Sequence, residues 1–126
     1  MEQFWMTDWK RIIKALQYSL KGFKAAWRNE AAFRQEILML VILVPTGLAM
    51  AESLTLKLFL LLNAALILIV ELLNSAVEAV VDRIGPEKHP LSGRAKDLGS
   101  AAQLVSLTAF VFLWLFIFFR YLLEPV

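Results

Sequence analysis

The sequence predicts an all-α membrane protein, with an N-terminal amphipathic surface helix followed by three transmembrane helices. Two observations support this prediction: 60% of the 126 residues are hydrophobic, and the mean hydropathy is +0.65. Soluble domains contain about 45–50% apolar residues, so the excess indicates a chain that lies largely in lipid. The chain has no cysteine and one histidine, which excludes thiol catalysis, disulfides and multi-histidine zinc sites. A metal site would therefore use carboxylate oxygens, which suit Mg²⁺ or Ca²⁺.

Residues 1–29 are predicted to form the amphipathic surface helix. Large apolar side chains recur at steps of three and four, and basic side chains fall between them. The apolar set is Trp5, Trp9, Ile12, Ile13, Leu16, Leu20, Phe23 and Trp27, and the basic set is Lys10, Arg11, Lys14, Lys21, Lys24 and Arg28. Tryptophan and lysine suit the lipid headgroup region, so surface anchoring is the simplest interpretation. Anchoring leaves individual basic residues free to contact phosphates as well.

The first transmembrane helix is predicted over residues 31–51. Its uncharged part, Ile37–Ala51, has 15 residues, which is fewer than the roughly 20 needed to cross the hydrocarbon core. We therefore expect the helix to begin near Ala31, with Arg34 and Glu36 near the interface or facing protein. A proline and a glycine within the segment are positions at which it can bend.

The second and third transmembrane helices are predicted over residues 56–84 and 98–119. Gly85 and Pro86 end the second helix, because glycine favours a helix C-terminus and proline cannot continue the helix. A polar loop is expected over residues 86–93. The third segment is the clearest of the three, since its 22 residues are all uncharged and are sufficient to span the membrane.

Lysine and arginine are distributed unevenly about these segments. Seven lie in the chain up to Arg34 and four between Arg83 and Lys96, whereas only Lys57 and Arg120 fall on the opposite side. The positive-inside rule therefore places the N-terminus and the second loop in the cytoplasm and the C-terminus in the periplasm or outside. No internal repeat divides the sequence, so the whole chain is expected to be one membrane-embedded domain.

A polar stripe on the second transmembrane helix is the feature most indicative of function. Glu71, Asn74, Glu78 and Asp82 are spaced by three, four and four residues, so they share one helix face. Charged groups at membrane depth are rare unless they pair, bind an ion or line a polar cavity. Three interpretations compete: interhelical hydrogen bonds, a proton relay, and a site for magnesium that arrives bound to a nucleotide. Interhelical contacts alone leave two glutamates seven residues apart unexplained.

A second charged cluster follows the stripe, in the segment PEKHPLSGRAKD. Its charged or titratable members are Glu87, Lys88, His89, Arg94, Lys96 and Asp97. A solvated loop that obeys the positive-inside bias explains roughly half of such segments, and for His89 alone an exposed histidine is the simpler interpretation. Lys96 and Asp97 are expected at the level of Glu78, where they would pair across helices or bind phosphate. Glu30 would add a third carboxylate near the same plane.

Three helices cannot easily shield the polar stripe and fill a core at the same time. Small residues that permit close helix packing occur on both the second and third segments. They are Ser75, Ala76, Ala79, Ser100, Ala101 and Ala102. We therefore expect a homo-oligomer that buries the stripe against neighbouring copies.

Four stretches of the chain, taken together, closely resemble the bacterial membrane-embedded diacylglycerol kinases. They are RIIKA at 11–15, NEAAFRQE at 29–36, VELLNSAVEAVVDRIG at 70–85 and HPLSGRAKDLGSAA at 89–102. The pattern E-x-x-N-S-A-x-E-x-x-x-D, combined with S-G-R-A-K-D, is highly specific. The resemblance implies a homotrimer in the bacterial inner membrane with each active site near the cytoplasmic face. It also implies transfer of the γ-phosphoryl group of Mg²⁺-bound ATP to the hydroxyl of diacylglycerol, giving phosphatidic acid.

The resemblance further implies roles for residues at matching positions. Glu71 is implied as the general base for the lipid hydroxyl, and Asn74 as the residue that positions Glu71 or the phosphates. Glu30 and Glu78 are implied as the Mg²⁺ ligands. The implied ATP contacts are Arg11, Lys14, Tyr18, Glu30, Glu78, Glu87, Lys88, His89, Lys96 and Asp97. The implied lipid contacts are Arg11, Ser19, Phe33, Glu71 and Ser100.

Two alternatives to a diacylglycerol kinase remain at this point. Some similar proteins phosphorylate undecaprenol, although the NEAAFRQE and SGRAKD stretches favour the diacylglycerol branch. A small proton-coupled transporter or a structural membrane protein would use the stripe without ATP. That alternative leaves Glu30 and the charged second loop without a shared purpose. No nucleic-acid partner is expected.

Overall fold

The computed structural model describes the backbone of residues 2–124 and the side chains of residues 8–124. Its helices are α1 (Glu2–Asn29), α2 (Ala31–Met50), α3 (Leu54–Ile84) and α4 (Pro90–Leu123). The prediction of an all-α chain is therefore confirmed for the described part. Trp5, which belongs to the predicted apolar face of the N-terminal helix, lies outside the described side chains.

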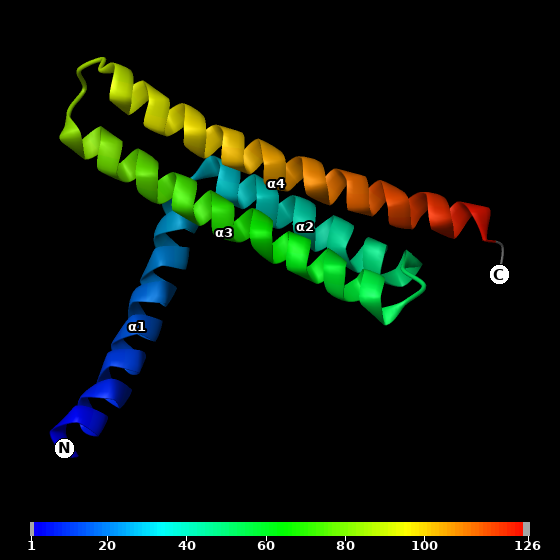
Figure 1. Ribbon diagram of the computed structural model, residues 1–126, viewed down its shortest axis with the longest axis horizontal. Coiled ribbons are helices and arrows are strands. Elements are labelled where there is room, and N and C mark those ends of the chain that lie inside the picture. Colours follow the sequence, from blue (N-terminus) through cyan, green and yellow to red (C-terminus); the bar gives the residue numbers. More distant parts are fainter. Residues whose placement is uncertain (1, 125–126) are drawn as a thin grey trace.

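Helices α2, α3 and α4 pack side by side, whereas α1 projects away from them (Figure 1). Each of the three packed helices is long and apolar enough to cross a membrane, as the sequence predicted. The 20 residues of α2 extend about 30 Å, which matches the hydrocarbon core of a bilayer. With 31 and 34 residues, α3 and α4 are longer than that thickness requires.

The junction between α1 and α2 is a single extended residue, Glu30, with φ −113° and ψ 105°. Its amide still donates to the carbonyl oxygen of Ala26 at 2.9 Å. The Arg34 guanidinium donates to the carbonyl oxygen of Trp27 at 2.8 Å, so it satisfies one of the free carbonyls at the end of α1. The Glu30 carboxylate makes no capping hydrogen bond to α2, so its oxygens remain available to accept other hydrogen bonds or to bind an ion.

The connection between α3 and α4 is shorter than predicted. Gly85, with φ +152°, ends α3 as expected, but α4 begins at Pro90, so the predicted loop over 86–93 was wrong in its second half. Proline has its φ already set for the first position of a helix. His89 caps the same turn, because its Nδ1 accepts a hydrogen bond from the amide of Leu91 at 3.1 Å. Much of the predicted charged loop is consequently the first turns of α4.

The turn between α2 and α3 also ends earlier than predicted, because α3 begins at Leu54 rather than near residue 56. The Ser53 hydroxyl accepts a hydrogen bond from the amide of Leu56 at 3.2 Å. A serine in this position satisfies one of the free amides of the first turn. Two further residues of the predicted turn are therefore helical.

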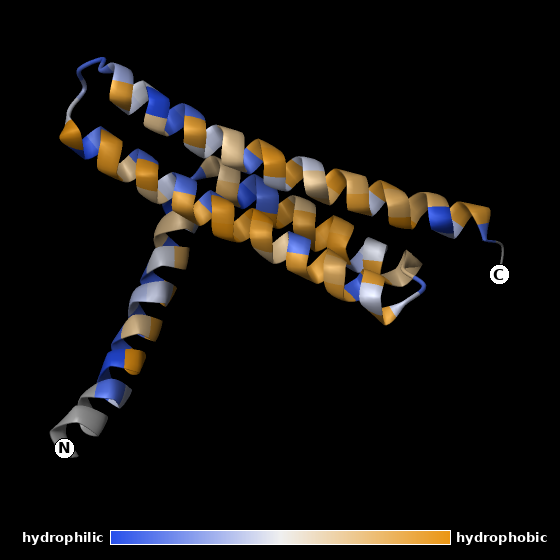
Figure 2. Cartoon of the chain, viewed as in Figure 1, coloured by the Kyte–Doolittle hydropathy of each residue, from blue (hydrophilic) through white to orange (hydrophobic). Residues whose placement is uncertain are grey.

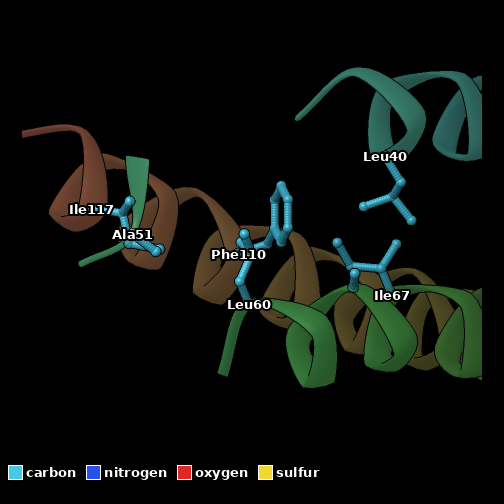
Figure 3. Close-up of a cluster of buried hydrophobic side chains, with 7 residues drawn as sticks. Leu40, Ala51, Leu60, Ile67, Phe110 and Ile117 are labelled. Carbon is cyan, nitrogen blue, oxygen red and sulfur yellow. The ribbon is translucent and has the colours of Figure 1, made fainter. Parts of the chain in front are cut away.

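The hydrophobic core lies among α2, α3 and α4 and in the turn that joins α2 to α3 (Figure 3). It consists of Leu40, Ala51, Leu60, Ala64, Ile67, Phe110 and Ile117. Close approach of the helices depends on Gly47, because a Cβ atom there would lie 2.7 Å from Leu60 Cδ2 and 3.1 Å from Trp114 Nε1. The Trp114 indole in turn donates to the carbonyl oxygen of Leu43 at 2.9 Å, which ties α4 to α2.

The outer surface of the packed helices is largely apolar. Leu62 and Phe112, for example, are 67% and 70% exposed. Figure 2 shows that hydrophobic residues dominate α2, α3 and α4 over most of their length, and that hydrophilic residues become more frequent towards the loop between α3 and α4. The functional residues predicted from the sequence lie mainly towards that loop.

Candidate functional site

Three helices each contribute one polar side chain to a buried group that we call the carboxylate–amide cluster. It contains Glu36 from α2, Glu71 from α3 and Gln103 from α4, which are 9%, 4% and 8% exposed. The Gln103 amide nitrogen donates to Glu36 Oε1 at 2.5 Å and to Glu71 Oε2 at 3.1 Å. Buried carboxylates are tolerated where hydrogen-bond donors face them. One amide group therefore joins all three helices at this level.

The orientation of the Gln103 amide is set by Ser106, one turn further along α4. The Ser106 hydroxyl donates to Gln103 Oε1 at 2.6 Å, and this serine is 2% exposed. Because the amide oxygen already accepts from a hydroxyl, the amide nitrogen is the atom that faces the carboxylates. The result is a directed chain of donors from Ser106 through Gln103 to Glu71.

The other carboxylate oxygen of Glu71 accepts a longer, weaker hydrogen bond from a residue of its own helix. Glu71 Oε1 lies 3.4 Å from the Ser75 hydroxyl, which is at the long end of hydrogen-bond distances. An ionised carboxylate has about four lone-pair positions, and these contacts leave several of them free. Glu71 is thus held in place and can still accept a proton from a hydroxyl group.

Glu71 and Gln103 line a cavity of about 370 Å³, which we call the carboxylate cavity. Its other lining residues are Glu30, Ala32, Glu36, Asn74, Glu78, Ser100, Leu104 and Leu107. The structure therefore brings five of the residues singled out in the sequence to one cavity. These are Glu30, Glu71, Asn74, Glu78 and Ser100.

A larger cavity of about 690 Å³ separates α1 from α3. Ser19 and Asp82 line it, and Glu30 and Glu78 line both this cavity and the carboxylate cavity. Across the described residues, no group of three or more histidine, cysteine, aspartate or glutamate side chains is arranged to hold a metal. Mg²⁺ usually takes one or two carboxylates together with substrate phosphates and water. Glu30 and Glu78 are the residues here that could supply those one or two carboxylates.

Asn74 of α3 lies against Gly99 of α4. A Cβ atom on Gly99 would lie only 2.0 Å from Asn74 Oδ1, so the absence of a side chain on α4 makes room for the asparagine. Asn74 Oδ1 is buried and has no hydrogen-bond partner among the described residues. Asn74 therefore has unused hydrogen-bonding capacity beside Glu71 and Glu78.

The loop between α3 and α4 and the adjoining helix ends line a third cavity, of about 550 Å³. Glu87, Lys88 and His89 line it together with Lys96 from α4. The Lys96 ammonium group lies 2.8 Å from Asp82 Oδ1 on α3. The sequence predicted cross-helix pairing as one alternative for Lys96, and this ion pair has that form, with both side chains accessible to solvent.

Several predicted contacts do not converge on Glu71 within one chain. Arg11, Lys14 and Tyr18 line a shallow hollow formed by α1 alone, on the part of the helix that projects from the bundle (Figure 1). Phe33, implied as a lipid contact, is 4% exposed and so is packed against protein. Asp97 is exposed on α4.

Gln103 and Ser106 are site residues that the sequence did not predict, and Glu36 had no predicted function. The third apolar segment reads as an uncharged span, and the resemblance implies a substrate contact there only for Ser100. The available signal was an amide at the sixth position of the 22-residue uncharged stretch, because polar groups at membrane depth usually face protein or a cavity. Its contact with Glu71 follows from the packing of α4 against α3, which the sequence does not specify.

Comparison with known proteins places this chain in a recognised family. Residues 17–118 match the family model described as prokaryotic diacylglycerol kinase. The chain is 51% identical to a diacylglycerol kinase of Escherichia coli K12 and 52% identical to one of Pseudomonas aeruginosa, in each case over 108 residues that cover 86% of this chain and 88% of the relative. A diacylglycerol kinase of Helicobacter pylori is 42% identical over 83% of this chain and 82% of its own length. The chain belongs to the prokaryotic diacylglycerol kinase family.

Proposed function

We propose that this protein is a lipid kinase that transfers the γ-phosphoryl group of Mg²⁺-bound ATP to the hydroxyl of diacylglycerol, giving phosphatidic acid and ADP. One observation carries the proposal beyond family membership. Glu71, a buried carboxylate held by hydrogen-bond donors, shares a cavity with Glu30 and Glu78. A proton acceptor and a pair of potential metal ligands are the groups that such a transfer requires from the protein.

In the proposed reaction, the lipid hydroxyl oxygen attacks the γ-phosphorus as the bond from that phosphorus to the bridging oxygen of ADP breaks. The hydroxyl proton passes to the Glu71 carboxylate. Glu71 is fixed by α4 and by its own helix, so the acceptor oxygen is held in place before the substrate arrives. Asn74, beside it in the cavity, is proposed to position Glu71 or the phosphates.

Glu30 and Glu78 are proposed to hold the magnesium ion. Glu30 sits at the junction of α1 and α2 with a carboxylate unused in capping, and Glu78 lies two turns along α3 from Glu71. When bound, Mg²⁺ supplies neutralisation of the charge that develops on the transferring phosphate oxygens. The two glutamates line both neighbouring cavities, which supports a site that nucleotide and lipid approach from different directions.

Basic and polar residues around the loop between α3 and α4 are proposed to bind the nucleotide. Lys96, Glu87, Lys88 and His89 share a cavity there. Asp97 follows Lys96 on α4, and we propose that it also faces the nucleotide. Cations near the phosphates would counter the charge of ATP and orient it for transfer. We propose that Ser19, Ser100 and Phe33 contact the lipid. Ser19 lines the cavity between α1 and α3, and Ser100 lines the carboxylate cavity.

Arg11, Lys14 and Tyr18 are proposed as further ATP contacts, with Arg11 also near the lipid. Because they lie on the projecting part of α1, they would contact ATP only if a neighbouring copy of the chain packs beside that part and brings its own site close. We propose a homotrimer, supported by the extensive apolar surface of α2, α3 and α4 and by the small residues of α3 and α4. The chain would form one membrane-embedded kinase domain in that assembly.

The proposed setting is the bacterial inner membrane. The distribution of lysine and arginine supports a cytoplasmic N-terminus and a periplasmic or outer C-terminus. Helix α1 is proposed to lie at the cytoplasmic surface, because its described tryptophans, Trp9 and Trp27, are 71% and 52% exposed and suit the headgroup region. Diacylglycerol would then reach Glu71 from the bilayer, and ATP from the cytoplasm.

The direct test is transfer of labelled γ-phosphate from magnesium-ATP to lipid by the purified protein in mixed micelles. Diacylglycerol and undecaprenol are offered separately, with Glu71→Gln as the inactive variant and Glu52→Gln as a matched control at the opposite end of the bundle. Label in phosphatidic acid that disappears in Glu71→Gln, or on removal of Mg²⁺ with a chelator, supports the proposal. Label only in the polyprenyl product would show that the lipid acceptor is undecaprenol and not diacylglycerol. An absence of label in either lipid, from folded oligomer, would refute a lipid kinase and favour a transporter.

A further inference from the structure

The Gln103 side chain occupies a position that simple helix packing does not require. It is an amide within the uncharged part of α4, it is 8% exposed, and it lines the carboxylate cavity beside Glu71. A leucine or methionine of similar length would satisfy packing against α2 and α3 without burying polar atoms. The chain instead places two donors of one amide against two carboxylates.

We propose that Gln103 is a positioning residue for Glu71: oriented by Ser106, it holds the Glu71 carboxylate in the geometry that accepts the substrate proton. This inference rests on the proposed role of Glu71 as the general base. Gln103 itself touches neither reactant in the proposal. It acts through Glu71.

The hydrogen bonds around Glu71 show how this positioning works. Gln103 Nε2 donates to Oε2 at 3.1 Å, whereas the Ser75 hydroxyl is 3.4 Å from Oε1. The bond from α4 is the shorter of the two and the only one of them that comes from another helix. A glutamate has three rotatable side-chain bonds, so without this donor its carboxylate would sample other rotamers in the cavity.

Glu36 strengthens the arrangement from the opposite side. Its Oε1 accepts the shorter bond, 2.5 Å, from the same amide nitrogen, while Ser106 holds the amide oxygen at 2.6 Å. Gln103 is therefore fixed at both ends before it meets Glu71. A side chain held at two other points can place its remaining hydrogen with little freedom, which is the requirement for a supporting residue around a catalytic group.

The test uses the full-length protein in mixed micelles, with kcat and KM measured for magnesium-ATP and for diacylglycerol. Gln103→Met keeps the length of the side chain and removes both donors. We expect kcat to fall on the order of 100-fold with both KM values changed less than about twofold, as for a misplaced group that acts only in the transition state. Val105→Ala, two residues away at a 70% exposed position, is the matched control and should keep wild-type kcat.

A second pair of variants covers the possibility that Gln103→Met does not fold. Ser106→Ala keeps the amide but releases its orientation, so kcat should fall about tenfold, while Ser106→Thr retains the hydroxyl and should restore most of the rate. A purely structural role predicts lower thermal stability without this split between Ser106→Ala and Ser106→Thr. Unchanged kcat in Gln103→Met or in Ser106→Ala, or a raised KM at constant kcat, would overturn the inference.

The wild-type protein and Glu71→Gln separate this inference from the proposed function. If the wild type phosphorylates diacylglycerol and Glu71→Gln does not, the proposed function holds, and the Gln103 and Ser106 variants then decide the positioning role alone. If Glu71→Gln retains near-normal turnover, the assignment of the base fails and the positioning role fails with it.

Discussion

The two ends of the helix bundle use glutamate in opposite ways. Near the α1–α2 junction, Glu36 and Glu71 are buried and share the amide of Gln103. At the other end, Glu52 in the turn between α2 and α3 pairs with Arg120 of α4, with both nitrogen–oxygen distances at 3.4 Å. The first group is enclosed by three helices and lines a cavity, whereas the second is open to solvent.

Their energetic contributions differ accordingly. Exposed ion pairs contribute little to stability, because water screens them and two long side chains must be ordered. Buried carboxylates lose far more hydration, and hydrogen bonds only partly offset that loss. Burial of Glu36 and Glu71 is therefore expected to cost stability, which agrees with the proposal that Glu71 has a role in the reaction. This difference supports the proposed catalytic role at the end that carries Glu71. At the other end, it supports a purely structural role for the Glu52–Arg120 pair.

The largest expected effect comes from removing the charge of the proposed base. Glu71→Gln should lower kcat by about 10²–10⁴-fold, the range typical for loss of a general base. The protein should remain folded, because the introduced amide keeps an oxygen that can accept from Gln103. Phosphoryl transfer to diacylglycerol, together with size-exclusion chromatography in detergent, measures both.

The comparison between the two ends supplies the control for that experiment. Glu52→Gln makes the same chemical change at the solvent-exposed end and should leave kcat at the wild-type value. Equal losses of activity from the two variants would mean that burial of a glutamate does not mark the functional site.

A smaller effect is expected at the proposed metal ligand. Glu78→Gln should raise the KM for magnesium-ATP about tenfold, equivalent to about 1.4 kcal/mol of binding free energy, and should change kcat less than Glu71→Gln does. The reason is that Glu78 is proposed to bind the ion while Glu71 is proposed to move the proton. Titration of initial rates against Mg²⁺ at fixed ATP distinguishes the two. A lower kcat with an unaltered magnesium dependence would contradict the assignment.

Gly99 and Gly47 allow the two ends of the bundle to be compared by substitution, because a Cβ atom at either position would meet a neighbouring side chain. A methyl group on Gly99 would lie 2.0 Å from Asn74 Oδ1 at the end that carries Glu71, whereas one on Gly47 would meet the flexible end of Leu60 at 2.7 Å. Gly99→Ala should therefore displace Asn74, lower kcat, and destabilise the protein by about 1–3 kcal/mol, as overpacking typically does. Gly47→Ala should cost stability while leaving kcat unchanged. Thermal unfolding in detergent and the kinase assay report the two effects separately, and a loss of kcat in Gly47→Ala alone would reverse the assignment of the two ends.

Much of the fold could be predicted from the sequence because helices in a membrane are marked by long apolar stretches. The start of α2 at Ala31 and the end of α3 before Gly85 were predicted correctly. The start of α4 at Pro90 was not, because HPLSGRAKD is polar and hydropathy does not distinguish a polar helix from a loop. The proline and the capping His89 were the local signals for that helix start.

The candidate site likewise has a part that could be predicted from the sequence and a part that could not. Spacing along one helix placed Glu71, Asn74 and Glu78 on a single face, and the structure brings them to one cavity. The contribution of Gln103 depends on how α4 is rotated against α3, which is a long-range property with no periodic signal in the sequence. Periodicity finds residues that share a helix, and the packed structure is needed to find their partners on other helices.

The smallest expected effect lies in the pH dependence of the exposed end. Hydrogen bonding to Arg120 holds the pKa of Glu52 below its ordinary value of 4.5, so the folded state favours the ionised carboxylate. The stabilisation is present above that ordinary pKa and is lost as the pH falls through the lowered pKa of the folded state. Wild type and Glu52→Gln should therefore differ slightly in unfolding temperature at neutral pH and converge in acid, because the pair is open to solvent and screened. Thermal scans across this range at low salt provide the measurement, and a difference that grows towards acid pH would show that Glu52 is held by something other than Arg120.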